Sequence, residues 1–291
     1  MKVLVNASNE GKPMGRGVFD GIRALGARGI RTDIYTDAPH LQLREFVDYQ
    51  DLQLLLIIMG DKVPGTPDDL VKRAREVADL AKQLDMDKLP LPPMFELANE
   101  PDAPKKYVPT IWRKKPELFG AKVAETARAI WGILGQSTLV ISGGVTTPSK
   151  DSQDYLRKAA KYFPRGEGKF ALGFHHYAPG MGDPDKPHKG FKTVKDQMQA
   201  LKAIGFDLFD TESGGHTAPP EKHNDDEIAR WLGRRLDINK EHGVLGSVVY
   251  QWLDGPSPSY FNDRFGLMTM DGTPKKSAEA LRSWLSGGAP A

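Results

Sequence analysis

The feature that most constrains this chain is an eightfold recurrence of a short apolar segment, a polar loop and a helical stretch. The apolar segments have the length of β-strands and cover Lys2–Asn6, Ile30–Tyr35, Leu52–Met59, Pro93–Asn99, Thr138–Ser142, Ala171–Tyr177, Asp207–Glu212 and Ser247–Leu253. Apolar residues at helical spacing predict helices over Asp68–Leu84, Pro116–Leu134, Thr193–Ile204, Asp225–Lys240 and Lys276–Leu285, with a shorter helix around Leu41–Val47. Strands that alternate with helices favour a parallel sheet with right-handed crossovers.

Eight such units in 291 residues fit a closed barrel better than an open, doubly wound sheet. An open sheet that binds a dinucleotide would carry G-x-G-x-x-G after its first strand. Gly15 and Gly17 follow that strand but the third glycine is missing. We therefore predict an α/β fold in which residues 1–291 form a single (β/α)8 TIM barrel.

Composition excludes several classes of partner. The chain has 40 Lys and Arg against 38 Asp and Glu, so its formal charge of +2 favours neither nucleic acid nor an anionic membrane as a partner. No apolar run is long enough to cross a membrane. The absence of cysteine excludes disulfides, thiolate metal sites and a cysteine nucleophile. The start, MKVLVNASNEG, is not a signal peptide, and we favour a secreted protein whose signal peptide has been removed over a cytoplasmic one. We also expect a monomer.

The residues that close the strands are the candidates for chemistry, because barrel active sites lie at the C-terminal ends of the strands. Glu100 follows strand four and Glu212 closes strand seven. These strands lie on opposite sides of an eight-stranded ring, so the two carboxyl groups could face each other across its mouth. Glycoside hydrolysis needs such a pair, one protonated and one ionised, and a separation of about 5–5.5 Å gives retention of configuration.

Other strand ends carry polar and aromatic side chains. Tyr35 and Asp37 follow strand two, with Arg31 nearer its start, and strand six ends in His175, His176 and Tyr177. Trp252 lies at the end of strand eight. The aromatic loop residues predicted on the same face, which could line a saccharide groove, are Tyr107, Trp112, Tyr260 and Phe261.

Glu96 lies four residues before Glu100, so on a strand both side chains point to the inside of the barrel, and Glu96 should lie lower in it. A buried carboxylate requires a partner, for which Arg31 or a histidine is suited.

The histidines do not indicate a metal site. His175 and His176 are adjacent, so on a strand their side chains point to opposite sides and cannot share one ion. No H-E-x-x-H motif and no phosphate-binding G-x-x-x-x-G-K-[ST] loop occurs. We predict no metal and no cofactor.

Several motifs, in order along the chain, resemble the clan A glycoside hydrolases. Phe95–Pro101 (FELANEP) resembles their strand-four Asn-Glu-Pro signature, and HHY at 175–177 is similar to their strand-six His-x-Tyr. Asp210–Gly215 (DTESGG) and Tyr250–Gly255 (YQWLDG) resemble their strand-seven nucleophile segment and strand-eight tryptophan segment. Phe265–Leu281 resembles the common turn that leads into the last helix. The family-five cellulases and mannanases are the nearest likeness, although strand three ends IIMGD without their usual histidine and the first 60 residues match poorly.

This resemblance implies a retaining β-glycosidase that cleaves a β-linked poly- or oligosaccharide by double displacement. It implies that Glu100 is the general acid/base and Glu212 the nucleophile. The remaining roles that it implies are binding of the sugar 2-hydroxyl by Asn99, a hydrogen bond to the nucleophile from Tyr177, shaping of the subsite by His175, stacking under the sugar by Trp252, and maintenance of the nucleophile's charge by Arg31.

Some alternatives stay open at the level of sequence. The loops look short, which favours an open groove and endo cleavage, but the glycan can be glucan, mannan, xylan or galactan. A non-hydrolytic carbohydrate-binding barrel, or a transglycosylase on the same scaffold, is the alternative function. A binding protein has no need of a second glutamate, so the pair favours an enzyme.

Overall fold

A computed structural model describes residues 1–7, 14–34, 39–59, 66–103, 110–146, 149–177, 183–186, 193–218, 223–257 and 261–287. Eight parallel strands pair in chain order, and β1 also pairs with β8, so the sheet closes into a barrel. The strands are β1 (Lys2–Asn6), β2 (Gly29–Asp33), β3 (Gln53–Met59), β4 (Met94–Ala98), β5 (Val140–Ile141), β6 (Phe170–His176), β7 (Asp207–Ser213) and β8 (Gly246–Val249). The predicted (β/α)8 barrel is confirmed.

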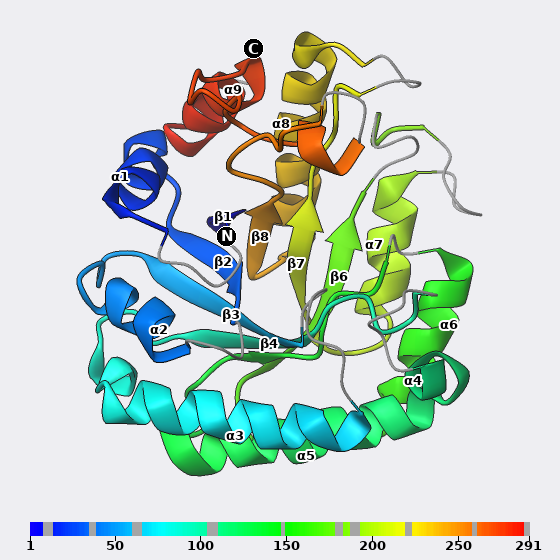
Figure 1. The fold of residues 1–291 in the computed structure, drawn as a ribbon. Coiled ribbons are helices and arrows are strands. Elements are labelled where there is room, and N and C mark those ends of the chain that lie inside the picture. The colour runs from blue at the N-terminus through cyan, green and yellow to red at the C-terminus, as the bar shows by residue number, and fades with distance from the viewer. Residues whose placement is uncertain are drawn as a thin grey trace.

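Helices surround this ring of strands (Figure 1). The α-helices of the described residues are α1 (Arg16–Leu25), α2 (Pro39–Val47), α3 (Pro67–Gln83), α4 (Thr110–Lys114), α5 (Pro116–Leu134), α6 (Lys150–Ala159), α7 (Val194–Lys202), α8 (Asp225–Glu241) and α9 (Lys276–Leu285). The same described ranges include two short 3-10 helices in connections, η1 (Met86–Lys88) and η3 (Phe261–Arg264). None of the helices in these ranges is long and apolar enough to cross a membrane.

The sequence pattern places the elements well but misplaces some ends. The helices over Pro116–Leu134 and Lys276–Leu285 begin and end as predicted. Strand β8, predicted to continue to Leu253, ends at Val249. The backbone N–H groups of Gln251 and Trp252 then donate to Phe265 and Asn6 rather than continuing the ladder. This early end changes where the side chains after Val249 point.

Apolar side chains fill the barrel in two separate regions. The large cluster lies between the strands and the surrounding helices. A second, small cluster closes the barrel interior with side chains from seven strands: Leu4, Leu55, Met94, Ile141, Ala171, Phe209 and Val248. Above these side chains the interior is polar, with Arg31 and Glu96 almost fully buried. The apolar layer thus forms a floor on which the polar residues of the barrel stand.

Helix α5 contains two glycines that differ only in their surroundings, and they give a matched test of the packing. A Cβ added at Gly120 would lie 2.2 Å from the carbonyl oxygen of Ala159 on α6, whereas one at Gly132 would meet nothing within 4 Å. We predict that Gly120→Ala destabilises the fold by about 1–3 kcal/mol through overpacking. Gly132→Ala should stabilise it by about 0.5–1 kcal/mol through helix propensity. Urea unfolding of both variants measures this, and equal effects at the two sites would contradict the observed packing of α5 on α6.

Candidate active site

Glu212 points into the barrel because β7 contains one extra residue. Phe174 and His175 of β6 pair with Asp210 and Glu212, so one residue of β7 is left over between these pairs. Strict alternation would place Asp210 and Glu212 on the same face, but the extra residue breaks it. Asp210 faces outward and bonds to Asn239 of α8, whereas Glu212 faces the barrel mouth. The extra residue of β7 therefore directs the side chain of Glu212 into the barrel mouth.

Glu100 reaches the same place from the segment that follows β4. Its backbone has φ of +47°, a left-handed conformation that is unfavourable for a residue with a Cβ and that costs about 1–3 kcal/mol. Two backbone hydrogen bonds hold it there, from its own N–H to Gly144 (2.8 Å) and from the N–H of Ala103 to its carbonyl (3.0 Å). Such strain is found at functional sites more often than elsewhere.

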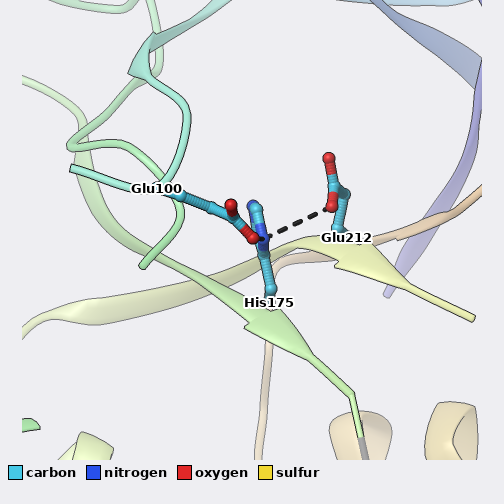
Figure 2. Close-up of side chains that lie close together, drawn as sticks. All are labelled: Glu100, His175 and Glu212. Carbon is cyan, nitrogen blue, oxygen red and sulfur yellow. Dashed lines mark hydrogen bonds and ion pairs between the residues drawn. The ribbon is translucent and has the colours of Figure 1, made fainter. Parts of the chain in front are cut away.

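His175 lies between the two glutamates (Figure 2). Its Nδ1 is 3.1 Å from Glu100 Oε1 and 3.3 Å from Glu212 Oε2, and the ring is fully buried. One carboxylate oxygen of Glu100 and one of Glu212 lie within 4.8 Å of each other. The two carboxyl groups, predicted to face each other across the barrel mouth, thus lie close together in the structure.

Each carboxylate oxygen of Glu212 accepts a hydrogen bond. Arg31 Nη1 donates to Oε1 at 2.8 Å, and the Tyr177 hydroxyl donates to Oε2 at 3.0 Å. Burial and the negative charge of Glu212 raise the pKa of Tyr177 well above its ordinary value, so this hydroxyl remains a donor. Both donors stabilise the ionised form of Glu212.

Arg31 is itself held by Glu96 from below. Nε and Nη2 donate to the two oxygens of Glu96 at 2.6 and 3.0 Å, a bidentate pair in which both side chains are buried. Burial opposes the charge of Arg31, but the carboxylates of Glu96 and Glu212 outweigh it and raise the pKa of Arg31. The expectation that Glu96 has a buried partner is confirmed, and that partner is Arg31.

Two asparagines complete the surroundings of the guanidinium. Arg31 Nη1 also donates to Asn6 Oδ1 at 3.0 Å, and Nη2 donates to Asn99 Oδ1 at 3.1 Å. Because Asn99 presents its amide oxygen to Arg31, the orientation of this amide is fixed. Asn6 ends β1 and was not singled out from the sequence, since an asparagine at a strand end carries no signal by itself.

Gly144 provides the space that His175 occupies. A Cβ on Gly144 would lie 2.3 Å from His175 Nε2 and 2.3 Å from Thr211 Oγ1. The N–H of Gly144 also donates to Glu96 Oε1 at 3.2 Å. A side chain at this position would therefore displace the histidine that bridges the two glutamates.

Trp252 does not join this group, which corrects its expected placement under a bound sugar. Its six-membered ring lies against Gly21 of α1, where an added Cβ would be 2.6 Å from Cζ2. The early end of β8 turns the side chain toward the helix layer outside the barrel. Tyr250 is the aromatic side chain next to the site, since its ring packs on Phe265, which also packs on Tyr177.

The remaining aromatic candidates are not assembled into a groove by the described residues. Trp112 lies in α4, is 1% exposed, and packs on Phe119. Tyr35, Asp37, Tyr107 and Tyr260, and the side chain of Phe261, lie outside the residues that the structure describes.

The three side chains of Figure 2 also have the spacing of a metal-ligand set. Glu100, His175 and Glu212 each offer one donor atom within 4.8 Å of the other two. Neither the adjacent histidines nor the H-E-x-x-H motif sought in the sequence points to this mixed set. Both oxygens of Glu212 accept hydrogen bonds, one from Arg31 and one from Tyr177. A metal ion at this position would have to share these oxygens with the two donors.

Behind the site, a buried polar network joins β6, β7 and β8 to α8. Asn239 of α8 donates to Asp210 Oδ2 at 2.7 Å, and its Oδ1 lies 3.0 Å from His176 Nδ1. Ser247 also donates to Asp210. Burial, together with the positive charge of Arg235, lowers the pKa of His176 to about 3, and burial raises the pKa of Asp210 to about 6. As expected from strand geometry, His175 and His176 face opposite sides of β6.

Comparison with known proteins relates the chain to others by structure alone. No protein-family model matches it, and no curated protein matches it in sequence. An endo-β-1,4-glucanase from Xanthomonas axonopodis pv. citri superposes with a TM-score of 0.69 at 17% identity, covering 99% of this chain and 100% of that one. A family 39 glycoside hydrolase from Bacteroides cellulosilyticus superposes on this chain with a TM-score of 0.68 at 17% identity, covering 98% of this chain. An exo-β-1,4-mannosidase from an Opitutaceae bacterium superposes with a TM-score of 0.69 at 16% identity, also covering 98% of this chain. The chain spans only 63% and 59% of the length of these last two. At such low identity, these likenesses show the fold.

The buried network predicts opposite pH effects from two of its members. His176 contributes stability above its ordinary pKa of 6.5, and this is lost as pH falls toward about 3. Asp210 contributes stability below its ordinary pKa of 3.8, and this is lost as pH rises through about 6. Between pH 4 and 6 the two contributions oppose each other, at about 1.4 kcal/mol per pH unit each.

Replacing either group should therefore leave the pH dependence contributed by the other group unopposed. Relative to the unmodified protein, we expect the free energy of unfolding of Asp210→Asn to rise more steeply with pH between 4 and 6. That of His176→Gln should rise less steeply or fall. Urea unfolding at intervals of half a pH unit measures both slopes, and a shift of the two slopes in the same direction would refute the assignment.

Proposed function

We propose that this protein is a retaining glycoside hydrolase that acts on a β-linked poly- or oligosaccharide. The observation that carries the proposal is the close approach of Glu100 and Glu212, in which one carboxylate oxygen of each residue lies within 4.8 Å of the other. Retaining enzymes have carboxyl groups about 5–5.5 Å apart, whereas inverting enzymes need about 6.5–9.5 Å to admit a water molecule between carboxylate and sugar. The separation here favours direct attack by one carboxylate.

In the first step, a carboxylate oxygen of Glu212 attacks the anomeric carbon and forms a glycosyl ester. The bond between the anomeric carbon and the glycosidic oxygen breaks, and Glu100 transfers its proton to that oxygen as the leaving sugar departs. In the second step, Glu100, now ionised, takes a proton from water while the water oxygen attacks the anomeric carbon. The ester bond breaks, Glu212 is ionised again, and the sugar leaves with its original configuration.

The surroundings of the two glutamates favour this division of roles. Glu212 accepts hydrogen bonds from Arg31 and Tyr177, and both stabilise its negative charge. Glu100 lies beside that charge and in contact with His175. A second negative charge so close to the first is unfavourable, so a proton is retained on Glu100.

Two further side chains are assigned to substrate. Asn99 presents its amide oxygen to Arg31, so we assign its Nδ2 group to the sugar 2-hydroxyl. Tyr250, half-buried at the end of β8, takes the stacking role that the sequence had suggested for Trp252. The structural neighbours include both an endo-β-1,4-glucanase, which the chain matches over its whole length, and an exo-β-1,4-mannosidase, of which it spans 59%; we propose internal cleavage on the likeness in length to the first.

The direct test is hydrolysis of a panel of β-linked glycans by the unmodified protein, Glu100→Ala and Glu212→Ala. We expect one glycan to be cleaved and each substitution to lower kcat by several orders of magnitude, because each removes a group that takes part in bond breaking. Azide should rescue Glu212→Ala and give a glycosyl azide of inverted configuration. Circular dichroism of each variant provides the folding control.

The other outcomes distinguish the alternatives. Equal cleavage by all three proteins would place the chemistry elsewhere. Binding without cleavage would favour a carbohydrate-binding barrel, and products longer than the substrate would favour a transglycosylase. Loss of activity on addition of a chelator, restored by a divalent cation, would favour a metal site at Glu100, His175 and Glu212.

A milder substitution tests the hydrogen bond to the nucleophile. Tyr177→Phe removes only the hydroxyl that donates to Glu212 at 3.0 Å. A hydrogen bond to a charged group contributes about 1.5–3 kcal/mol, so we expect kcat/KM to fall by about 10- to 100-fold. Steady-state kinetics on the glycan identified above measures the change, and a variant as active as the parent would remove Tyr177 from the site.

A further inference from the structure

A pocket of about 480 Å³ lies beside the segment that carries Glu100 and is built mainly by other elements. Asp102 and Ala103, two and three residues after Glu100, form one wall. The other walls come from the end of α4, the start of α5, the segment after β5, and α6. None of the residues assigned above to the reaction lines this pocket.

The hydroxyl of Tyr155 is the unexplained feature of the pocket. The side chain is 8% exposed and lines the pocket, and its hydroxyl is buried without a hydrogen bond to any residue that the structure describes. Leaving such a group buried and unpaired costs about 1–3 kcal/mol, so a ligand that supplied its hydrogen-bond partner would recover this free energy. Burial and the nearby carboxylates of Asp102 and Glu117 raise the pKa of Tyr155, so its hydroxyl stays protonated and can donate.

The charged lining of the pocket is balanced. Three cationic and three anionic side chains line it, namely Arg113, Lys114, Lys158, Asp102, Asp151 and Asp154. Asp102 accepts two hydrogen bonds from Thr146, and Asp154 pairs with Arg157. By contrast, Arg113, Lys114 and Lys158 make no ion pair with any residue that the structure describes.

This balance identifies the class of ligand. A strongly anionic or cationic ligand would meet three like charges as well as three opposite ones. A neutral molecule with many hydroxyl groups can instead donate to the carboxylates and accept from the ammonium, guanidinium and phenol groups at the same time. A sugar unit has this pattern of alternating donors and acceptors, and the pocket volume lies within the range of small-molecule sites.

We propose that this pocket is an accessory sugar-binding site, in which Tyr155, Lys158 and Asp102 hold one unit of a glycan chain without cleaving it. The inference rests on the proposed function, since a glycan bound next to the Glu100 segment would be held near the site of cleavage. The pocket then raises affinity for a long chain through multivalency, whereas a short substrate cannot span both sites.

Binding is measured in the Glu212→Gln background, so that the probe is not degraded. Affinity electrophoresis in mixed-linkage β-glucan, β-mannan and β-xylan compares this parent with versions that also carry Tyr155→Phe or Lys158→Ala. We expect both to raise the dissociation constant for the glycan that binds by about fivefold, the effect of one hydrogen bond. The matched controls are Tyr162→Phe and Lys161→Ala, which lie just beyond α6 and outside the pocket and should change nothing.

Kinetics in the active protein give the second readout. Tyr155→Phe and Lys158→Ala should raise KM for the polysaccharide and leave kcat/KM for a short aryl glycoside unchanged. Melting temperatures check that each variant folds. If Tyr155→Phe is unstable because Tyr155 is buried, Lys158→Ala alone tests the accessory site, since Lys158 is exposed.

The outcomes separate this proposal from the proposed function. Cleavage of a glycan with binding unaffected by either pocket variant overturns the accessory site alone. Binding that depends on the pocket, without any cleavage, supports the site and overturns the hydrolase. Binding of none of the three polysaccharides overturns the accessory site.

Discussion

The buried guanidinium of Arg31 is the interaction on which the candidate active site depends. A cation inside a barrel loses its hydration, at a cost of several kcal/mol, and is tolerated only with good partners. Arg31 has them on every side, with a bidentate carboxylate below from Glu96, Glu212 above, and the amide oxygens of Asn6 and Asn99 beside it. One charge thus fixes the positions of four side chains that come from three other strands and one strand end.

The same arrangement explains how two glutamates that lie so close together differ. Glu96 and Glu212 share the single positive charge of Arg31, so the cluster already carries a net negative charge. Ionisation of Glu100 would add another negative charge within 4.8 Å of Glu212. The proposed acid therefore keeps its proton while the proposed nucleophile stays ionised, which is the asymmetry that double displacement requires.

Sequence patterns predicted the barrel and the glutamate pair because both depend on local signals. Apolar runs and helical spacing mark the elements, and parallel strands bring their C-terminal ends to one face. The parity of Glu96 correctly placed a buried carboxylate near Arg31. Motif resemblance added the roles of the residues, which spacing alone does not provide.

What the sequence did not predict depends on where regular geometry stops. The extra residue of β7 gives Asp210 and Glu212 opposite orientations, although their spacing implies one face. Strand β8 ends at Val249, so Trp252 turns toward Gly21 and Tyr250 stands next to the site instead. The contact of His175 with both glutamates, and the pocket around Tyr155, join segments far apart in the chain. A local sequence pattern does not predict such contacts between distant segments.

The central claim is that Glu212 forms a covalent bond with the sugar. The most direct measurement is mass spectrometry of the protein after incubation with activated 2-deoxy-2-fluoro β-glycosides, which slow breakdown of the glycosyl ester. The account predicts a mass increase of one glycosyl unit, located by peptide mapping at Glu212, and loss of the label in Glu212→Gln. A label on another residue, or a glycan product of inverted configuration with no label formed, would contradict it.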